Sequence, residues 1–158
     1  MLFRSPALAW AVGELGFGAG IMVSASHNPA PDNGLKVLDG AGLEVDEALE
    51  DRLEALMAPG ATGPRPGNDE MGRFGHDPLP VDRYRAARSA LAARAGGAFR
   101  LHLDCANGAA SALAGEILAA SGSAVSVHFA EPDGRNINDG CGATEPDALA
   151  AIVAREGG

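Results

Sequence analysis

Lysine and aromatic residues are scarce in this chain of 158 residues. Lys36 is its only lysine, and 12 basic side chains stand against 21 acidic ones, which gives a formal net charge of −9. Proteins that bind nucleic acids depend on clustered lysine and arginine, so this charge balance argues against a nucleic-acid partner. Aromatic residues make up 4% of the chain, which leaves few rings to stack on bases.

Cysteine and long apolar runs are also scarce. Cys105 and Cys141 are too few and too far apart for a disulfide framework or a zinc site of cysteine pairs, so we interpret them as reduced thiols of a cytoplasmic protein. No stretch approaches the roughly 18 apolar residues of a membrane span. Residues 1–10 show no signal-peptide cleavage pattern. We therefore expect neither a membrane partner nor export.

Hydrophobic residues make up 46% of the chain, enough for a folded core. Strands are expected over residues 20–23, 35–38, 99–104 and 124–129, and the apolar run 20–23 is expected to be buried on both faces. Helices are expected over residues 5–16, 46–58, 81–95 and 109–120, and from residue 145 onward. The predicted fold class is α/β, with mixed or parallel sheets and flanking helices; the unit 99–129 predicts a parallel strand pair.

Residues 61–80 are rich in glycine and proline and have no hydrophobic period. Such composition is typical of a linker or an irregular crossover. We therefore expect a domain boundary in this segment, with residues 1–72 and 73–158 as the two parts.

The loop of residues 24–34 gathers two serines, a histidine and two asparagines at the end of a predicted strand, and Lys36 follows it. Ligands of open α/β sheets bind at such strand ends. One interpretation is a serine that carries a phosphoryl group, with the ammonium of Lys36 favouring the charge. A phosphoserine adds roughly −1.5 to −2 charge, so this chemistry requires a cation. The alternative is a polar turn without chemistry.

Three stretches together resemble the α-D-phosphohexomutase family. They are Ser24-Ala25-Ser26-His27-Asn28-Pro29 with Asp32-Asn33-Gly34-Leu35-Lys36, then Asp104-Cys105-Ala106-Asn107-Gly108-Ala109, and then Pro132-Asp133-Gly134-Arg135-Asn136-Ile137-Asn138 with Cys141-Gly142-Ala143-Thr144. They occur in the family's order and span most of the chain. Within the family, the sequences of these motifs are most similar to those of members that interconvert glucosamine 6-phosphate and glucosamine 1-phosphate.

The resemblance implies roles for three residues. All three belong to the implied catalytic site: Ser26 is the phosphorylated serine, Lys36 gives acid, base or electrostatic help, and His27 shapes the loop and hydrogen-bonds nearby groups. The implied cofactor is Mg²⁺, held by the phosphate on Ser26 and by three aspartates of a separate loop. The implied partner is a phosphosugar, namely glucosamine phosphate.

The family's aspartate loop has no counterpart among these motifs, nor do its sugar-recognition and phosphate-binding loops or its opening basic motif. The resemblance therefore implies two incomplete phosphohexomutase-type domains: the C-terminal part of domain I and most of domain II. Such a chain is expected not to complete the catalytic cycle alone. Alternatives are a phosphomannomutase or phosphoglucomutase, or a non-catalytic remnant or interaction module. Oligomeric state is not predicted.

Several other polar residues are interpreted as structural. Cys105 and Asn107 are expected in a strand-to-helix turn, and Asp133, Asn136 and Asn138 in a turn network, because the EF-hand glutamate is lacking. His76, His102 and His128 are isolated along the sequence, which favours no shared site.

Overall fold

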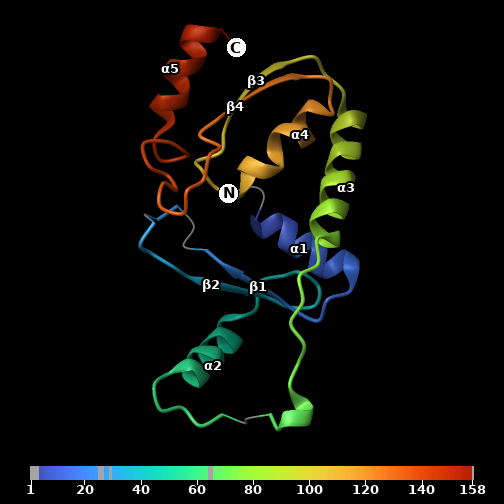
Figure 1. Ribbon diagram of the computed structural model, residues 1–158, viewed down its shortest axis with the longest axis vertical. Helices are drawn as coiled ribbons and strands as arrows, with labels where there is room; N and C mark the ends of the chain where they lie inside the picture. The colour runs from blue at the N-terminus through green and yellow to red at the C-terminus, as the bar shows by residue number, and fades with distance from the viewer. Residues whose placement is uncertain (1–3, 25–26, 29, 64–65, 158) are drawn as a thin grey trace.

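The computed structural model describes residues 4–24, 27–28, 30–63 and 66–157. Figure 1 shows two small sheets flanked by helices, which confirms the predicted mixed α/β class. The α-helices are α1 (Arg4–Leu15), α2 (Glu47–Met57), α3 (Leu79–Ala95), α4 (Ala114–Ala119) and α5 (Pro146–Glu156). The strands are β1 (Gly20–Val23), β2 (Leu35–Leu38), β3 (Arg100–Asp104) and β4 (Ala124–His128).

The first sheet pairs β1 with β2 in antiparallel register, so that Met22 lies opposite Lys36. Helix α1 covers one face of this sheet, and a Cβ added to Gly20 would meet Val12 Cγ2 at 2.7 Å. The other face is open, since Ile21 is 66% exposed. The prediction that β1 is buried on both faces is therefore wrong: only its alternate residues, Gly20 and Met22, are buried.

Helix α2 lies on the other side of this sheet from α1 (Figure 1). Asp46 caps it by accepting a hydrogen bond from the Leu49 N–H at 2.8 Å. The predicted amphipathic helix is confirmed, but none of its residues is buried, and Met57 is 68% exposed. The described residues that follow, 58–63 and 66–78, are irregular as predicted apart from one short 3₁₀ turn over Asn68–Glu70.

Helix α3 packs against both α1 and α4 (Figure 1). Tyr84, 4% exposed, meets Trp10 of α1 edge to face at 5.6 Å between ring centroids. The Arg88 guanidinium lies 5.2 Å from the centroid of the Tyr84 ring, which suits a cation–π contact. Arg85 approaches Glu116 of α4 at 3.4 Å. One helix thus links the two halves of the chain.

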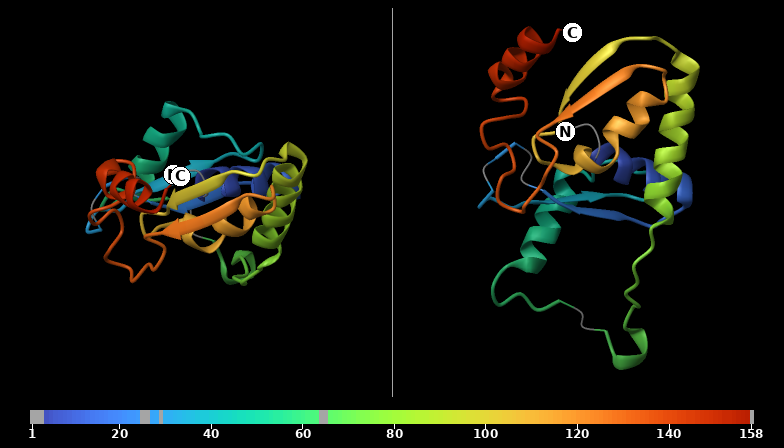
Figure 2. Two further views of the ribbon diagram at one scale, coloured as in Figure 1. Left: turned by 90° about the horizontal axis from the view of Figure 1, so that it is seen from above. Right: turned by 45° about the horizontal axis from the view of Figure 1, so that its top comes forward.

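The second sheet pairs β3 with β4 in parallel, as predicted. Helix α4 packs on one face, where a Cβ added to Gly115 would meet Val127 Cγ2 at 2.7 Å. Helix α5 contacts β3 (Figure 2). The helix expected over residues 109–120 is interrupted: a 3₁₀ turn spans Ala109–Ala112, and Leu113 leaves helical geometry at φ −130°. Within the described residues, none of the helices is long and apolar enough to cross a membrane.

Candidate active site

The residues predicted for serine chemistry fall in the loop that joins β1 to β2 and at the start of β2. The Ser24 N–H donates to the Gly34 carbonyl at 2.9 Å, which closes the base of the loop. Within the loop, Asn28 Nδ2 donates to Asp32 Oδ2 at 3.1 Å. Ser26 lies outside the described residues, so its placement remains a prediction.

Lys36 is the second residue of β2 and shares a sheet face with Met22. Its Nζ donates to Glu44 Oε1 at 2.5 Å, and the two side chains are 39% and 61% exposed. Glu44 reaches this position because its backbone forms a bridge with Leu38, two residues beyond Lys36. An exposed ion pair stabilises a protein by about 0–1 kcal/mol. Lys36 can therefore leave Glu44 for an anionic ligand at little cost.

His27 is exposed and lines a pocket of about 390 Å³ with residues from the far end of the chain. Its other polar lining residues belong to the loop after β4: Arg135, Asn138, Asp139, Thr144 and Glu145. Asn138 Nδ2 donates to the Asn28 carbonyl at 3.4 Å, which joins the two loops across 110 positions of sequence. Among the described residues, Lys36 does not line this pocket. The structure thus brings His27, but not Lys36, to the second loop.

The loop after β4 is held in place by the end of β3. Asp104 accepts from the N–H of Ala106 at 2.7 Å and from that of Gly142 at 2.8 Å. Asn107 donates through Nδ2 to the Asn136 carbonyl at 3.2 Å and accepts through Oδ1 from the Glu131 N–H at 3.1 Å. The motif of residues 104–109 therefore positions the motif of residues 132–144.

Asp133 and Asn136 form a turn network, as predicted. Asp133 Oδ1 accepts from the N–H groups of Arg135 at 2.7 Å and Asn136 at 2.9 Å. Asn136 Oδ1 accepts from the Asp133 N–H at 3.0 Å. These oxygen atoms satisfy backbone donors, which is the role of Asx turns rather than of cation ligands.

Cys105 and Cys141 are buried free thiols beside this network. Burial raises the pKa of both thiols, and the charge of Asp104 raises each further. Both are therefore protonated at neutral pH, and the thiol is a poor nucleophile. Their placement supports the structural interpretation of this motif.

Arg135 lines the pocket but was not among the predicted site residues. Among the described residues it forms no ion pair. A guanidinium beside an imidazole suits an anionic phosphate, although Asp139 and Glu145 line the same pocket. Its position in the loop that follows the end of β4 could have indicated Arg135, because ligands of α/β sheets bind at strand ends.

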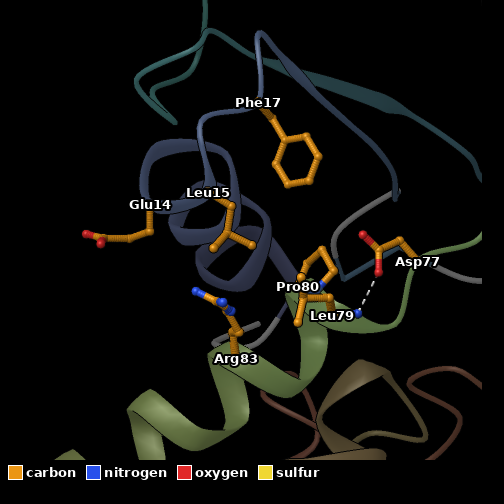
Figure 3. A pocket seen from close by; sticks show the side chains of 7 residues that line it. All are labelled: Glu14, Leu15, Phe17, Asp77, Leu79, Pro80 and Arg83. Carbon is orange, nitrogen blue, oxygen red and sulfur yellow. Dashed lines mark hydrogen bonds between the residues drawn. The ribbon is translucent and has the colours of Figure 1, made fainter.

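A second pocket, of about 410 Å³, lies between the end of α1 and the start of α3. Figure 3 shows Leu15 and Phe17 on the α1 side, facing Pro80 and Leu79. Asp77, just before α3, accepts from the N–H of its first residue, Leu79, at 2.9 Å. The lining offers no nucleophile next to a base, and we assign it no chemistry.

The prediction that His102 and His128 are isolated is wrong. His102 Nδ1 lies 3.0 Å from His128 Nε2, because β3 and β4 are parallel neighbours and both side chains share one sheet face. With Glu156 they form the group of three potential metal ligands that the described residues bring together. Two imidazoles suit Mg²⁺ poorly, since it prefers oxygen ligands. The residues described at the β1–β2 loop likewise form no magnesium site.

Comparison with known proteins gives two kinds of match. Residues 2–62 match the model of the family described as phosphoglucomutase/phosphomannomutase, alpha/beta/alpha domain I. The chain is 45% identical to a phosphoglucosamine mutase of Frankia alni over 150 residues, which cover 94% of the chain and 32% of that protein. It is 43% identical to one of Mycolicibacterium paratuberculosis (94% and 33%) and 40% identical to one of Moorella thermoacetica (99% and 35%). The chain thus spans about a third of the length of the curated relatives it matches.

Proposed function

Because this chain belongs to the α-D-phosphohexomutase family, we propose that it forms the serine-bearing part of a phosphoglucosamine mutase. Such an enzyme interconverts glucosamine 6-phosphate and glucosamine 1-phosphate. The observation that carries the proposal is the identity of 40–45% to phosphoglucosamine mutases over nearly the whole chain. The reaction class is an intramolecular phosphoryl transfer through a phosphoserine and a bisphosphate intermediate.

In the proposed reaction, Ser26 carries the phosphoryl group. A hydroxyl oxygen of the sugar phosphate forms a bond to phosphorus as the bond from phosphorus to Ser26 Oγ breaks. The proton of that hydroxyl leaves for solvent or a base, and Lys36 Nζ supplies a proton to Oγ. The second phosphate of the resulting bisphosphate then returns to Ser26 by the reverse step, which releases the isomerised sugar monophosphate.

Different observations support the roles proposed for Lys36 and His27. The weak pair of Lys36 with Glu44 leaves the ammonium able to turn to a phosphate. His27 lines the pocket between the two loops, where it can orient the serine loop against the loop after β4. Members of the family are generally magnesium-dependent. We propose that the phosphate on Ser26 offers an oxygen ligand to Mg²⁺; the described residues do not supply the carboxylates, so we derive no step through the ion.

We further propose that residues 1–72 and 73–158 are the two domain parts. The irregular segment after α2 and the separate sheets on either side support this division. A cytoplasmic location fits the proposed substrate, because a phosphosugar is too highly charged to cross a bilayer unaided.

The test is phosphoryl transfer to Ser26. The purified chain is incubated with glucosamine 1,6-bisphosphate and Mg²⁺, and phosphorylated peptides are mapped by mass spectrometry. We expect phosphate on Ser26, none in Ser26→Ala, and unchanged labelling in Ser24→Ala, which removes the neighbouring hydroxyl. Lys36→Met is expected to slow labelling by roughly 100-fold, within the range of acid–base catalysis.

Other outcomes would favour the alternatives. Faster labelling by glucose or mannose bisphosphates would favour a phosphoglucomutase or phosphomannomutase. Absence of labelling from every bisphosphate, both in this folded chain and in a longer chain that includes the aspartate loop, would favour a non-catalytic module.

A further inference from the structure

The parallel pairing of β3 and β4 sets two imidazoles side by side on the sheet face opposite α4. The register pairs His102 with Ser126 and Asp104 with His128. Both histidines therefore project from the sheet face opposite to the one on which Val127 contacts α4. Their rings are nearly parallel, at 7°, with centroids 5.3 Å apart. Both side chains are partly buried. This is an ordered pair rather than two independent surface groups.

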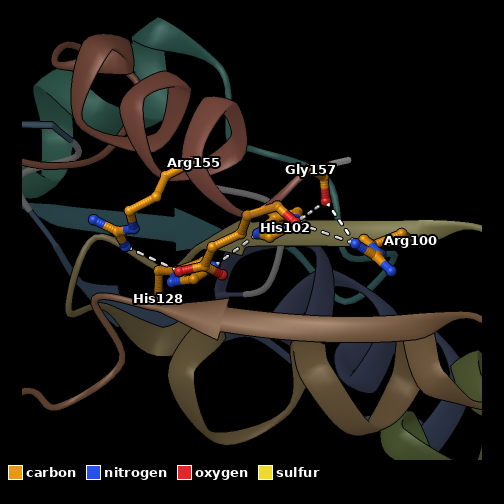
Figure 4. A network of polar contacts seen from close by, with 6 residues as sticks. Arg100, His102, His128, Arg155 and Gly157 are labelled. Atoms are coloured by element: carbon orange, nitrogen blue, oxygen red, sulfur yellow. Dashed lines mark hydrogen bonds and ion pairs between the residues drawn. The ribbon is translucent and has the colours of Figure 1, made fainter.

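The last turn of α5 contributes the third group. Glu156 places a carboxylate oxygen so that one atom from each of Glu156, His102 and His128 lies within 4.8 Å of the others. Figure 4 shows the two imidazoles between Arg155 and Arg100, next to this turn. Three elements far apart in the sequence thus converge on one point.

The surroundings of His102 fix which nitrogen can bind a ligand. His102 Nε2 lies 3.3 Å from the Gly157 carbonyl oxygen. A carbonyl only accepts, so this contact requires the proton on Nε2 and leaves the lone pair on Nδ1. That lone pair points to the side of His128. A backbone carbonyl that holds the outer N–H of an imidazole is the usual support of a metal-ligating histidine.

The charges around the site are mixed, with one carboxylate and two guanidinium groups. The cluster lies at the C-terminus of α5, the negative end of the helix dipole. Arg155 Nη2 donates to Glu156 Oε1 at 2.9 Å, so an ion bound here would share the carboxylate with one guanidinium. Arg100 does not reach the carboxylate; its Nη1 donates to the carbonyls of Glu156 and Gly157 at 3.2 and 3.1 Å.

We propose that His102, His128 and Glu156 bind a divalent transition-metal ion of the zinc class and so tie α5 to the second sheet. Two imidazoles and one carboxylate are a common ligand set for zinc. Nitrogen ligands of one tetrahedral zinc lie about 3.3 Å apart, since each bond is about 2.0–2.1 Å. The observed separation of 3.0 Å needs only a small adjustment. Without an ion, His128 Nε2–H is the donor to the lone pair of His102 Nδ1. On binding, the Nε2 proton of His128 leaves to solvent, Nδ1 takes up a proton in its place, and no redox change occurs.

This site is independent of the proposed phosphoryl transfer. It differs from the implied magnesium site in its ligand type and in its elements. Its proposed role is to stabilise the docking of α5, because an ion that binds the folded state and not the unfolded one raises stability.

The test is a titration of the metal-free 158-residue chain with Zn²⁺ by calorimetry and with Co²⁺ by absorption spectroscopy. We expect one ion per chain and a Co²⁺ spectrum without a sulfur charge-transfer band. His102→Ala and His128→Ala are each expected to weaken binding at least tenfold, by analogy with the roughly 10–100-fold effect of lost supporting groups. Glu156→Gln is expected to weaken it less. His76→Ala, which removes an exposed histidine elsewhere, serves as the matched control.

A second measurement guards against variants that fail to fold. In the unaltered chain, imidazole NMR signals of His102 and His128 should shift on adding Zn²⁺, while those of His27 and His76 should not. Three results would each overturn the proposal: no stoichiometric binding, equal affinity in the folded His102→Ala and His128→Ala variants, or cobalt spectra that show thiolate ligands. The pair would then be a hydrogen-bonded contact only.

Discussion

At the residue scale, Gly142 shows why the loop after β4 needs a residue without a side chain. Its φ is +88°, and an added Cβ would lie 2.9 Å from Ala106 Cβ. Its N–H must also stay in place to donate to Asp104. The positive φ and the close approach to Ala106 therefore both disfavour a side chain at position 142.

We predict that Gly142→Ala lowers the free energy of unfolding by about 2–3 kcal/mol, since left-handed backbone strain of about 1–2 kcal/mol adds to the clash. Gly140→Ala is the control, because φ is +61° there but no atom lies within 4 Å of the added Cβ. Urea unfolding measures both. Equal losses in the two variants would show that the contact with Ala106 contributes nothing.

The two buried thiols give a prediction on reactivity. We expect iodoacetamide at pH 8 to modify Cys105 and Cys141 at least about tenfold more slowly in the folded chain than in urea, because reaction requires local opening and a thiolate. Mass spectrometry of the modified chain measures the rate. Rapid labelling of either cysteine in the folded chain would contradict their burial.

The same raised pKa values predict the sign of a pH effect. The folded state holds these thiol protons more tightly than the unfolded state does. Their contribution to stability is therefore complete below the unfolded pKa of about 8.5 and is lost as pH rises through the higher folded value.

At the element scale, α2 depends on its cap more than on tertiary packing. None of its residues is buried, and an isolated helix of this length is marginal in water. The cap by Asp46 satisfies one of the free N–H groups at its start.

We predict that Asp46→Ala destabilises α2 by about 1 kcal/mol. Because the helix is exposed, the loss should appear as faster amide exchange within residues 47–57 rather than as a change in global unfolding. Asp51→Ala, a change in the middle of the same helix, is the control and should have a smaller effect. Slower or unchanged exchange in Asp46→Ala would contradict the role of the cap.

The sequence predicted the elements better than their environment. Strands 20–23 and 35–38 were predicted to the residue because glycine and proline turns bound short apolar runs. The break at Leu113, where φ is −130°, was missed because no glycine or proline stands at that position to indicate it. The exposed face of β1 and the pairing of His102 with His128 were missed because both depend on which elements lie beside each strand, and local periodicity contains no such information. For the predicted site, the loop motif indicated Lys36 and His27. It could not show that Lys36 pairs with Glu44. It also could not show that Arg135 lines the same pocket as His27.

At the scale of the whole molecule, α3 joins the two sheets into one structure. It contacts α1 through Tyr84 and Trp10, and α4 through Arg85 and Glu116. The other contact described between the halves, from Asn138 Nδ2 to the Asn28 carbonyl, is a single exposed hydrogen bond of 3.4 Å. Cooperative unfolding therefore depends on this helix.

We predict that Tyr84→Ala lowers the free energy of unfolding by about 3–5 kcal/mol, the range for removing a buried aromatic side chain. Tyr84→Phe keeps the ring against Trp10 and Arg88 and should retain most of that stability. Trp10 is the only tryptophan, so its fluorescence reports on the junction while circular dichroism reports on all helices. Coincident urea transitions by the two probes are expected in the unaltered chain, as for a two-state domain. If fluorescence changed well before the helices unfolded, the junction would open first and α3 would not couple the halves.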